Sequence, residues 1–174
     1  MRAFTLLSLA IVAAAPLGAQ TPAAGSREYQ LRMLEHQRTQ LLAMADSMPE
    51  RLYRDRATPE QRDFAQQIHH AANSAAYIAS ITMNGPKPAL PDTAAALNSR
   101  AGLKGFVNAS YDYAAALLKT QTPASRAETV KLFGNSMPRW QVWDEIHTHT
   151  VWTAGQVVAN FRKNGMAPPA FTFF

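Results

Sequence analysis

The histidines are the residues of this sequence whose type and spacing could do chemistry. His69 and His70 are adjacent in one segment, His147 and His149 lie close together in another, and His36 has no such neighbour. The chain of 174 residues contains no Cys, which excludes thiolate metal sites, Cys nucleophiles and disulfide scaffolds. Any metal ion would therefore need His, carboxylate or water as its ligands.

Helical geometry allows each close pair of histidines only one natural ligand. Successive residues turn by about 100° around a helix, so His147 and His149 point about 160° apart and cannot bind one ion together. His147 shares its face with aromatic residues, whereas His149 shares its face with polar ones. The polar members of that second face are Thr153, Gln156 and Asn160. We therefore favour His149 over His147 as functional, while periodicity does not separate His69 from His70.

The start of the chain has the composition of a secretory signal peptide. Arg2 precedes a mostly apolar run from Phe4 to Ala15, which small residues follow. That run is too short to span a bilayer. We expect residues 1–20 to be removed, residues 21–25 to form a flexible leader, and residues 26–170 to fold as one exported domain, periplasmic or secreted, with no membrane span after cleavage.

The distribution of charged residues in the mature chain does not indicate a nucleic-acid partner. The sequence has 17 Lys plus Arg and 12 Asp plus Glu. Removal of Arg2 with the signal leaves 17 minus 1, or 16, bases against 12 acids, a net charge of +4. These bases form no Lys/Arg-rich run of about five to eight residues, so nucleic-acid binding is not expected. A small-molecule ligand and the oligomeric state, a homodimer included, stay open.

The first half of the mature chain predicts two amphipathic helices. Ser26 is a suitable cap for the first, which runs to about Met48. Thr58 is the expected N-cap of the second, and Gln61 would close a capping box with it. The turn at residues 84–86, Asn-Gly-Pro, is expected to end this second helix.

The second half predicts two more helices. Thr93 to Lys119 follows a proline-rich loop, and Pro138 to Asn164 is a long helix that Gly165 would close. Between them, the ambiguous stretch from Ala127 to Gly134 does not alternate with period two over enough residues to predict a strand. Four amphipathic segments predict an all-α four-helix bundle, in which sites are built from side chains on facing helices.

Two blocks of the sequence have the form of motifs. They are Phe64-Ala-Gln-Gln-Ile-His-His-Ala-Ala-Asn73 and His149-x5-Gly155-Gln156-Val-Val-x-x-Phe-Arg-x-Asn-Gly165-x-x-Pro168-Pro169. Together they resemble the signature blocks of the DinB-like superfamily of helical metalloproteins. The resemblance extends from Thr58 to Pro169, and its C-terminal block is the more specific part.

The resemblance implies a DinB-like four-helix bundle that holds one divalent metal ion, zinc or nickel. The family uses one His of the second helix and an H-x-x-x-H pair on the fourth, positions that fall here on His70, His149 and Thr153. Thr153 departs from that pattern, since it is not a histidine. A neutral hydroxyl is a poor replacement for imidazole as a metal ligand. Water could complete the ligand set, or Glu145, which could instead accept a hydrogen bond from His149.

Two classes of function follow. The first is an exported metal-dependent enzyme, a hydrolase or a thiol-transferase-like protein by analogy with the family, whose related members act as thiol-dependent transferases or isomerases. The second is a non-catalytic bundle that has lost the metal and binds a small molecule or a partner protein. Asn73 and Tyr77 would line the pocket on the His70 side of the second helix, and Gln156 would hydrogen-bond inside the bundle.

Overall fold

The structure is a computed structural model of the chain and describes residues 25–170, 172 and 173. The expected signal peptide, residues 1–20, and the leader up to residue 24 lie outside these described residues. The described chain is mostly helical and includes one small sheet. Its elements are α1 (Arg27–Ser47), the short 3-10 helix η1 (Glu50–Leu52), α2 (Phe64–Thr82), α3 (Thr93–Asn98), α4 (Arg100–Thr120), α5 (Pro123–Ala127), β1 (Thr129–Leu132), β2 (Asn135–Pro138) and α6 (Arg139–Lys163).

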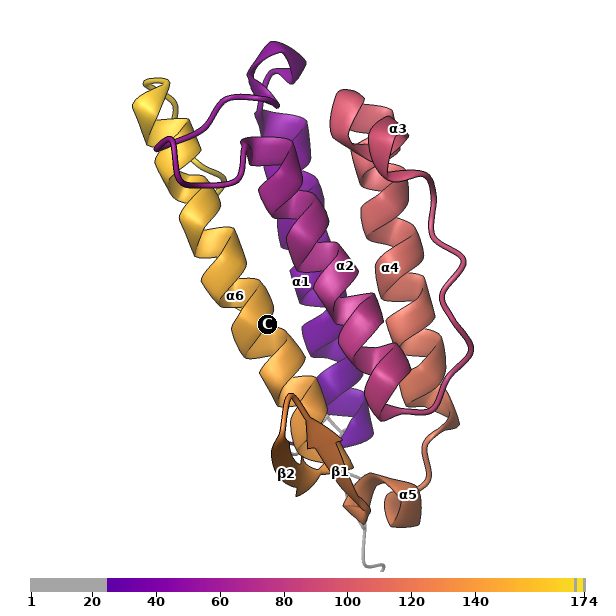
Figure 1. Cartoon of the computed structure of the whole chain (residues 1–174). Coiled ribbons are helices and arrows are strands. Elements are labelled where there is room, and N and C mark those ends of the chain that lie inside the picture. The colour runs from indigo at the N-terminus through magenta and orange to yellow at the C-terminus, as the bar shows by residue number, and fades with distance from the viewer. Residues whose placement is uncertain (1–24, 171, 174) are drawn as a thin grey trace, which may run out of the picture.

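Four long helices, α1, α2, α4 and α6, lie side by side (Figure 1). α2 packs against both α4 and α6, and α1 packs against the same two helices. The hairpin and α5 lie together at one end of these helices. No helix in the described part of the chain is long and apolar enough to cross a bilayer.

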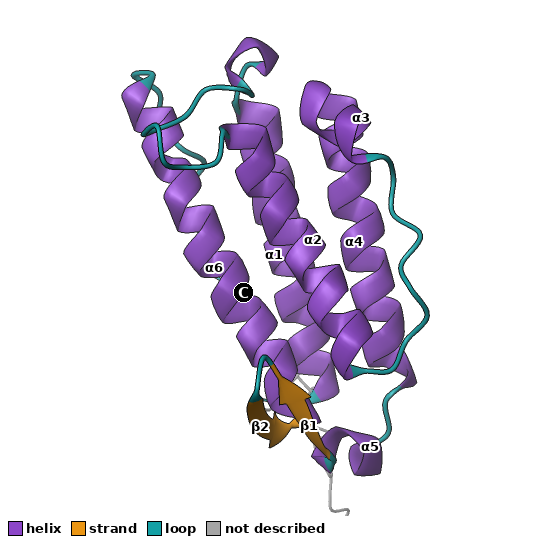
Figure 2. Ribbon diagram, in the orientation of Figure 1, coloured by secondary structure: helices purple, strands orange, loops and turns teal. Residues whose placement is uncertain are grey.

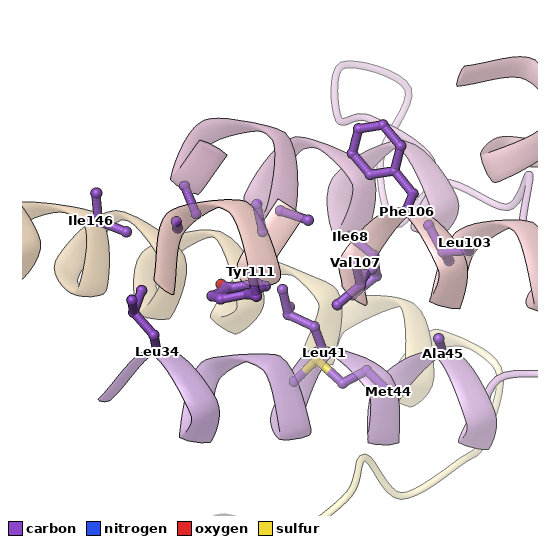
Figure 3. Close-up of a cluster of buried hydrophobic side chains, with 14 of the residues drawn as sticks. Leu34, Leu41, Met44, Ala45, Ile68, Leu103, Phe106, Val107, Tyr111 and Ile146 are labelled. Atoms are coloured by element: carbon purple, nitrogen blue, oxygen red, sulfur yellow. The ribbon is translucent and has the colours of Figure 1, made fainter. Parts of the chain in front are cut away.

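A continuous apolar core joins the long helices (Figure 3). Leu41 of α1, Ile68 of α2, Val107 of α4 and Ile146 of α6 are all buried in it. Each such side chain stabilises the fold by about 1.5–3 kcal/mol relative to leaving it in water. α2 also buries small side chains, which allow its neighbours to approach closely: Ala65, Ala71, Ala72, Ala75, Ala76 and Ala79.

The start of α2 differs from the expectation at Thr58. The helix begins at Phe64, and its capping box is formed by Asp63 and Gln66: Asp63 Oδ1 accepts from Gln66 N at 2.8 Å, and Gln66 Oε1 accepts from Asp63 N at 3.1 Å. The preceding chain folds back over this helix end, where Phe64 N donates to the carbonyl oxygen of Asp55. Tertiary hydrogen bonds therefore select the later of two locally suitable caps.

The single helix expected from Thr93 to Lys119 is interrupted. Ser99 has extended backbone angles, φ −149° and ψ 153°, and its Oγ accepts from Gly102 N at 3.0 Å. α3 therefore ends before Ser99 and α4 starts after it. Gly102 permits this break, because a Cβ there would lie 2.1 Å from the carbonyl oxygen of Ala95.

The expectation that the chain contains no strand is wrong. β1 and β2 pair antiparallel, with Val130 opposite Met137 (Figure 2). Phe133 (φ 47°) and Gly134 (φ 88°) form the two-residue turn, and positive φ at both positions is the conformation that suits a tight hairpin. Strands of four residues are too short for their alternation to stand out in the sequence.

The long C-terminal helix matches its prediction within a residue at each end. α6 runs from Arg139 to Lys163, inside the expected range of Pro138 to Asn164. Gly165 has φ +67° and donates its N–H to the carbonyl oxygen of Arg162 at 3.0 Å. A glycine in this left-handed conformation is a usual helix ending.

Candidate functional site

His70 and His149 come together where α2 packs against α6. Their ring centroids are 5.1 Å apart, and the ring planes are inclined by 69°. The two residues are 79 positions apart in the sequence, and the packing of the two helices brings them into contact. Both side chains are half-buried. Neither residue is fully buried, so the pair is partly exposed to solvent.

The surroundings keep both imidazoles neutral. Burial lowers the pKa of His70 to about 4, with smaller contributions from the positive charge of Arg62 and from the neighbouring histidines. Burial, and then Arg62, also lowers the pKa of His149. A neutral imidazole has one ring nitrogen with a lone pair, which is the form that binds metal ions. At neutral pH the pair can therefore donate two nitrogen lone pairs.

The separation of the rings suits a shared metal ion. Two imidazoles bound to one zinc ion, each with a Zn–N distance of about 2.0–2.1 Å, have ring centres roughly 5 Å apart. The described residues include no group of three or more His, Cys, Asp or Glu side chains that could hold a metal ion. A metal held here would have His70 and His149 as its protein ligands and would complete its shell with water or substrate.

Thr153, the third ligand position that the resemblance to the DinB-like superfamily implies, is buried. Its carbonyl oxygen is 3.5 Å from Gln67 Nε2, a long contact. The same Gln67 nitrogen donates to Gln156 Oε1 at 2.9 Å. Gln156 is thus held between α2 and α6 by a residue that the sequence analysis did not select. Gln67 lies one helical turn before His70, and this spacing predicts that the two side chains share a face of the helix.

Asn73 and Tyr77 line a groove on the same side of α2 as His70. The groove has a volume of about 630 Å³ and lies between α2, the loop at residues 85–92 and Phe106 of α4. Tyr77 is 50% exposed. The amide of Asn73 and the rings of Tyr77 and Phe106 therefore offer hydrogen bonds and an apolar surface beyond the histidine pair.

Glu145 lies apart from this arrangement. It lines a hollow beside the hairpin, and its Oε1 accepts from Gln141 Nε2 at 3.3 Å. None of the interactions found among the described residues joins it to His149. Glu145 shares the helical face of His149, as its spacing predicts, but in this structure its hydrogen bond is to the first turn of α6.

The other two histidines of the close pairs have different surroundings. His69 stacks on Phe106 with ring centroids 4.0 Å apart, and its buried Nε2 has no hydrogen-bond partner among the described residues. Burial lowers its pKa. His147 contacts α1, where its Nδ1 lies 3.1 Å from Gln37 Nε2. The divergence of His147 and His149 around α6 is the one that helical geometry predicts.

Comparison of the chain with models of known protein families finds no match. Comparison with curated proteins finds none either. The likeness to the DinB-like superfamily therefore rests on the two sequence blocks.

Proposed function

We propose that this chain is an exported metal-dependent enzyme with the DinB-like four-helix bundle, and that His70 and His149 hold one divalent ion, zinc or nickel. The observation that carries the proposal is the contact of two neutral imidazoles, with centroids 5.1 Å apart, across the α2–α6 interface. The signal-like composition of residues 1–20 supports export. The reaction class is hydrolysis or thiol transfer on a small molecule.

The residues around the pair have distinct roles in this proposal. A divalent ion bound there would polarise a substrate oxygen or lower the pKa of a bound water. Asn73, Tyr77 and Phe106 bind the substrate in the groove between α2 and the loop at residues 85–92. The hydrogen bond from Gln67 to Gln156 fixes the spacing of α2 and α6 and so positions the two imidazoles. Burial keeps both imidazoles unprotonated, and the positive charge of Arg62 adds to this effect and favours an anionic substrate group nearby.

The alternative is a non-catalytic bundle that binds a small molecule or a partner protein without metal. The observation that favours it is Thr153, a buried neutral side chain where the family has its third histidine. A site with two protein ligands holds zinc less tightly than one with three or four. The groove beside Asn73 and Tyr77 serves as the binding site in this case as well.

Metal content distinguishes the two functions. The mature protein, purified without a His tag from metal-replete buffer, is compared with His70→Ala, His149→Ala and the control His36→Ala. We expect about one divalent ion per chain in the wild type and in His36→Ala, and none in the other two variants. Absence of metal from the wild type even in excess zinc or nickel would favour the binding protein over the enzyme.

A further inference from the structure

A second cavity lies on the opposite side of α6, between that helix and α1. Its volume is about 340 Å³, within the range of about 300–1,000 Å³ typical of small-molecule pockets. Leu41, Met44, Val151 and Ala154 form apolar walls. The polar lining residues are Gln37, Gln40, Thr150 and two histidines, His36 and His147. The described lining contains no Lys, Arg, Asp or Glu. The walls therefore suit an uncharged, largely apolar molecule.

A buried chain of hydrogen bonds supports the polar side of this cavity. Tyr111 Oη donates to Gln37 Oε1 at 3.2 Å and lies 3.3 Å from Thr150 Oγ1. Burial raises the pKa of Tyr111, so its hydroxyl keeps the proton that it donates. Because Gln37 Oε1 is an acceptor, its Nε2 must be the donor to His147 Nδ1. The donor and the acceptor are thereby fixed for the hydrogen bond from Tyr111 to Gln37 and for the one from Gln37 to His147.

Among the described residues, this orientation leaves one N–H donor of the Gln37 side chain without an acceptor. The side-chain amide has two N–H groups, and the described residues supply an acceptor for one of them, His147 Nδ1. Gln37 is only 3% exposed and lines the cavity. A buried donor without an acceptor is unfavourable, so an acceptor atom inside the cavity would satisfy it.

Gly155 supplies an independent observation. A Cβ built on Gly155 meets no atom of the described residues within 4 Å. Glycine in the middle of a helix is destabilising relative to alanine, and no packing requires it here. Gly155 does line the cavity. Its missing side chain leaves that wall open.

We propose that the α1–α6 cavity binds a small uncharged molecule that has a carbonyl group on an aromatic or aliphatic body. The carbonyl oxygen accepts the second N–H of Gln37, and the body packs against Leu41, Met44 and Val151. The α1–α6 cavity is separate from the His70–His149 pair, because the two lie on opposite faces of α6. The proposal therefore does not depend on the metal site.

The test uses acetophenone as the probe and ethylbenzene, which has a similar shape but no oxygen, as its matched comparison. Binding to the full mature protein is followed by NMR from the amide signals of Val151 and Ala154. We expect acetophenone to bind about three- to tenfold more tightly, the worth of one hydrogen bond. Equal binding of both probes would overturn the role of Gln37, and no binding of either at their solubility limits would overturn the site.

Substitutions locate the binding. Gly155→Leu directs a side chain into the open wall, and we expect it to weaken acetophenone binding at least about tenfold. Ala154→Leu is a second variant that fills the same cavity, and Ala159→Leu, exposed on the same helix, is the matched control. His70→Ala should leave probe binding unchanged. Unchanged binding in both folded cavity variants, or equal loss in the Ala159→Leu control, would place the probe elsewhere.

Discussion

Two histidines that are two residues apart on α6 meet different environments. His147 contacts α1, where Gln37 donates to its Nδ1. His149 contacts the ring of His70 on α2, and no hydrogen bond to either of those two rings is found among the described residues. A turn of about 200° around one helix thus separates a histidine held in a buried polar network from one whose nitrogens can serve as ligands. The position on the helix, rather than the residue type, decides what each imidazole can do.

The largest expected effect is a change in zinc affinity caused by a substitution on the face of α6 that carries His149. Thr153→His would add a third imidazole at the position where the family has one, and zinc affinity should rise by at least about a hundredfold, since even outer-shell partners contribute about 10–100-fold. Isothermal titration calorimetry of the metal-free variant and wild type measures the change. Ala159→His, which adds a histidine on the exposed side of α6, is the control.

Equal zinc affinity of the wild type and the Thr153→His variant would contradict the assignment of Thr153 to the ligand position. A gain that is also seen in Ala159→His would show that an added surface histidine is enough. Both outcomes would count against Thr153 as the third-ligand position, whereas the metal content of the wild type, His70→Ala and His149→Ala decides the metal site itself.

On the face of α6 that carries His147, a substitution in the buried hydrogen-bond network should change the stability of the protein rather than its metal affinity. Tyr111→Phe removes the hydroxyl between Gln37 and Thr150 and leaves their buried polar groups without this partner. We expect the free energy of unfolding to fall by about 1–3 kcal/mol, measured by urea denaturation. Tyr77→Phe alters a ring that is half exposed and should change the stability by no more than about 0.5 kcal/mol. Similar losses in both variants would argue against a special role for the buried network.

The histidine pair should in turn respond to pH. In the metal-free protein the pKa of His70 is about 4, below its value of about 6.5 in an unfolded chain. Between these values the unfolded state binds more protons than the folded state, so stability falls as the pH is lowered through this window and is unaffected by His70 above it.

His70→Gln should remove this part of the acid sensitivity. We expect the variant to lose roughly 1–2 kcal/mol less stability than the wild type between pH 7 and pH 4, a value that allows for solvent screening of the half-buried ring. Urea denaturation at several pH values in the presence of a chelator measures it. Parallel pH profiles of the two proteins would mean that His70 titrates normally in the fold.

Local patterns predicted the parts of the molecule that depend on one helix alone. The extent of α6, its ending at Gly165 and the opposite directions of His147 and His149 all follow from helical spacing. Periodicity alone left His69 and His70 equivalent. Their difference comes from their neighbours, Phe106 for the first and His149 for the second, which the sequence does not place.

The errors at the start of α2 and at the hairpin have other origins. Thr58 and Asp63 are both good caps by local rules, and the hydrogen bond from Phe64 N to the Asp55 carbonyl oxygen favours the later one. The second error concerns the hairpin of β1 and β2 beside α6, which the sequence did not predict. That hairpin itself consists of strands too short to reveal a period.

The smallest expected effect compares two glycines that both lie within helices, Gly155 in α6 and Gly102 in α4. Gly155→Ala places a methyl group in open space within α6 and should stabilise the protein by about 0.5–1 kcal/mol, the helix preference of alanine over glycine. Gly102→Ala should destabilise it, because its Cβ would lie 2.1 Å from the carbonyl oxygen of Ala95. Thermal and urea denaturation of the two variants measure whether each substitution raises or lowers the stability. A loss of stability in Gly155→Ala would mean that Gly155 serves packing after all, and the argument that it keeps the α1–α6 cavity open would fail with it.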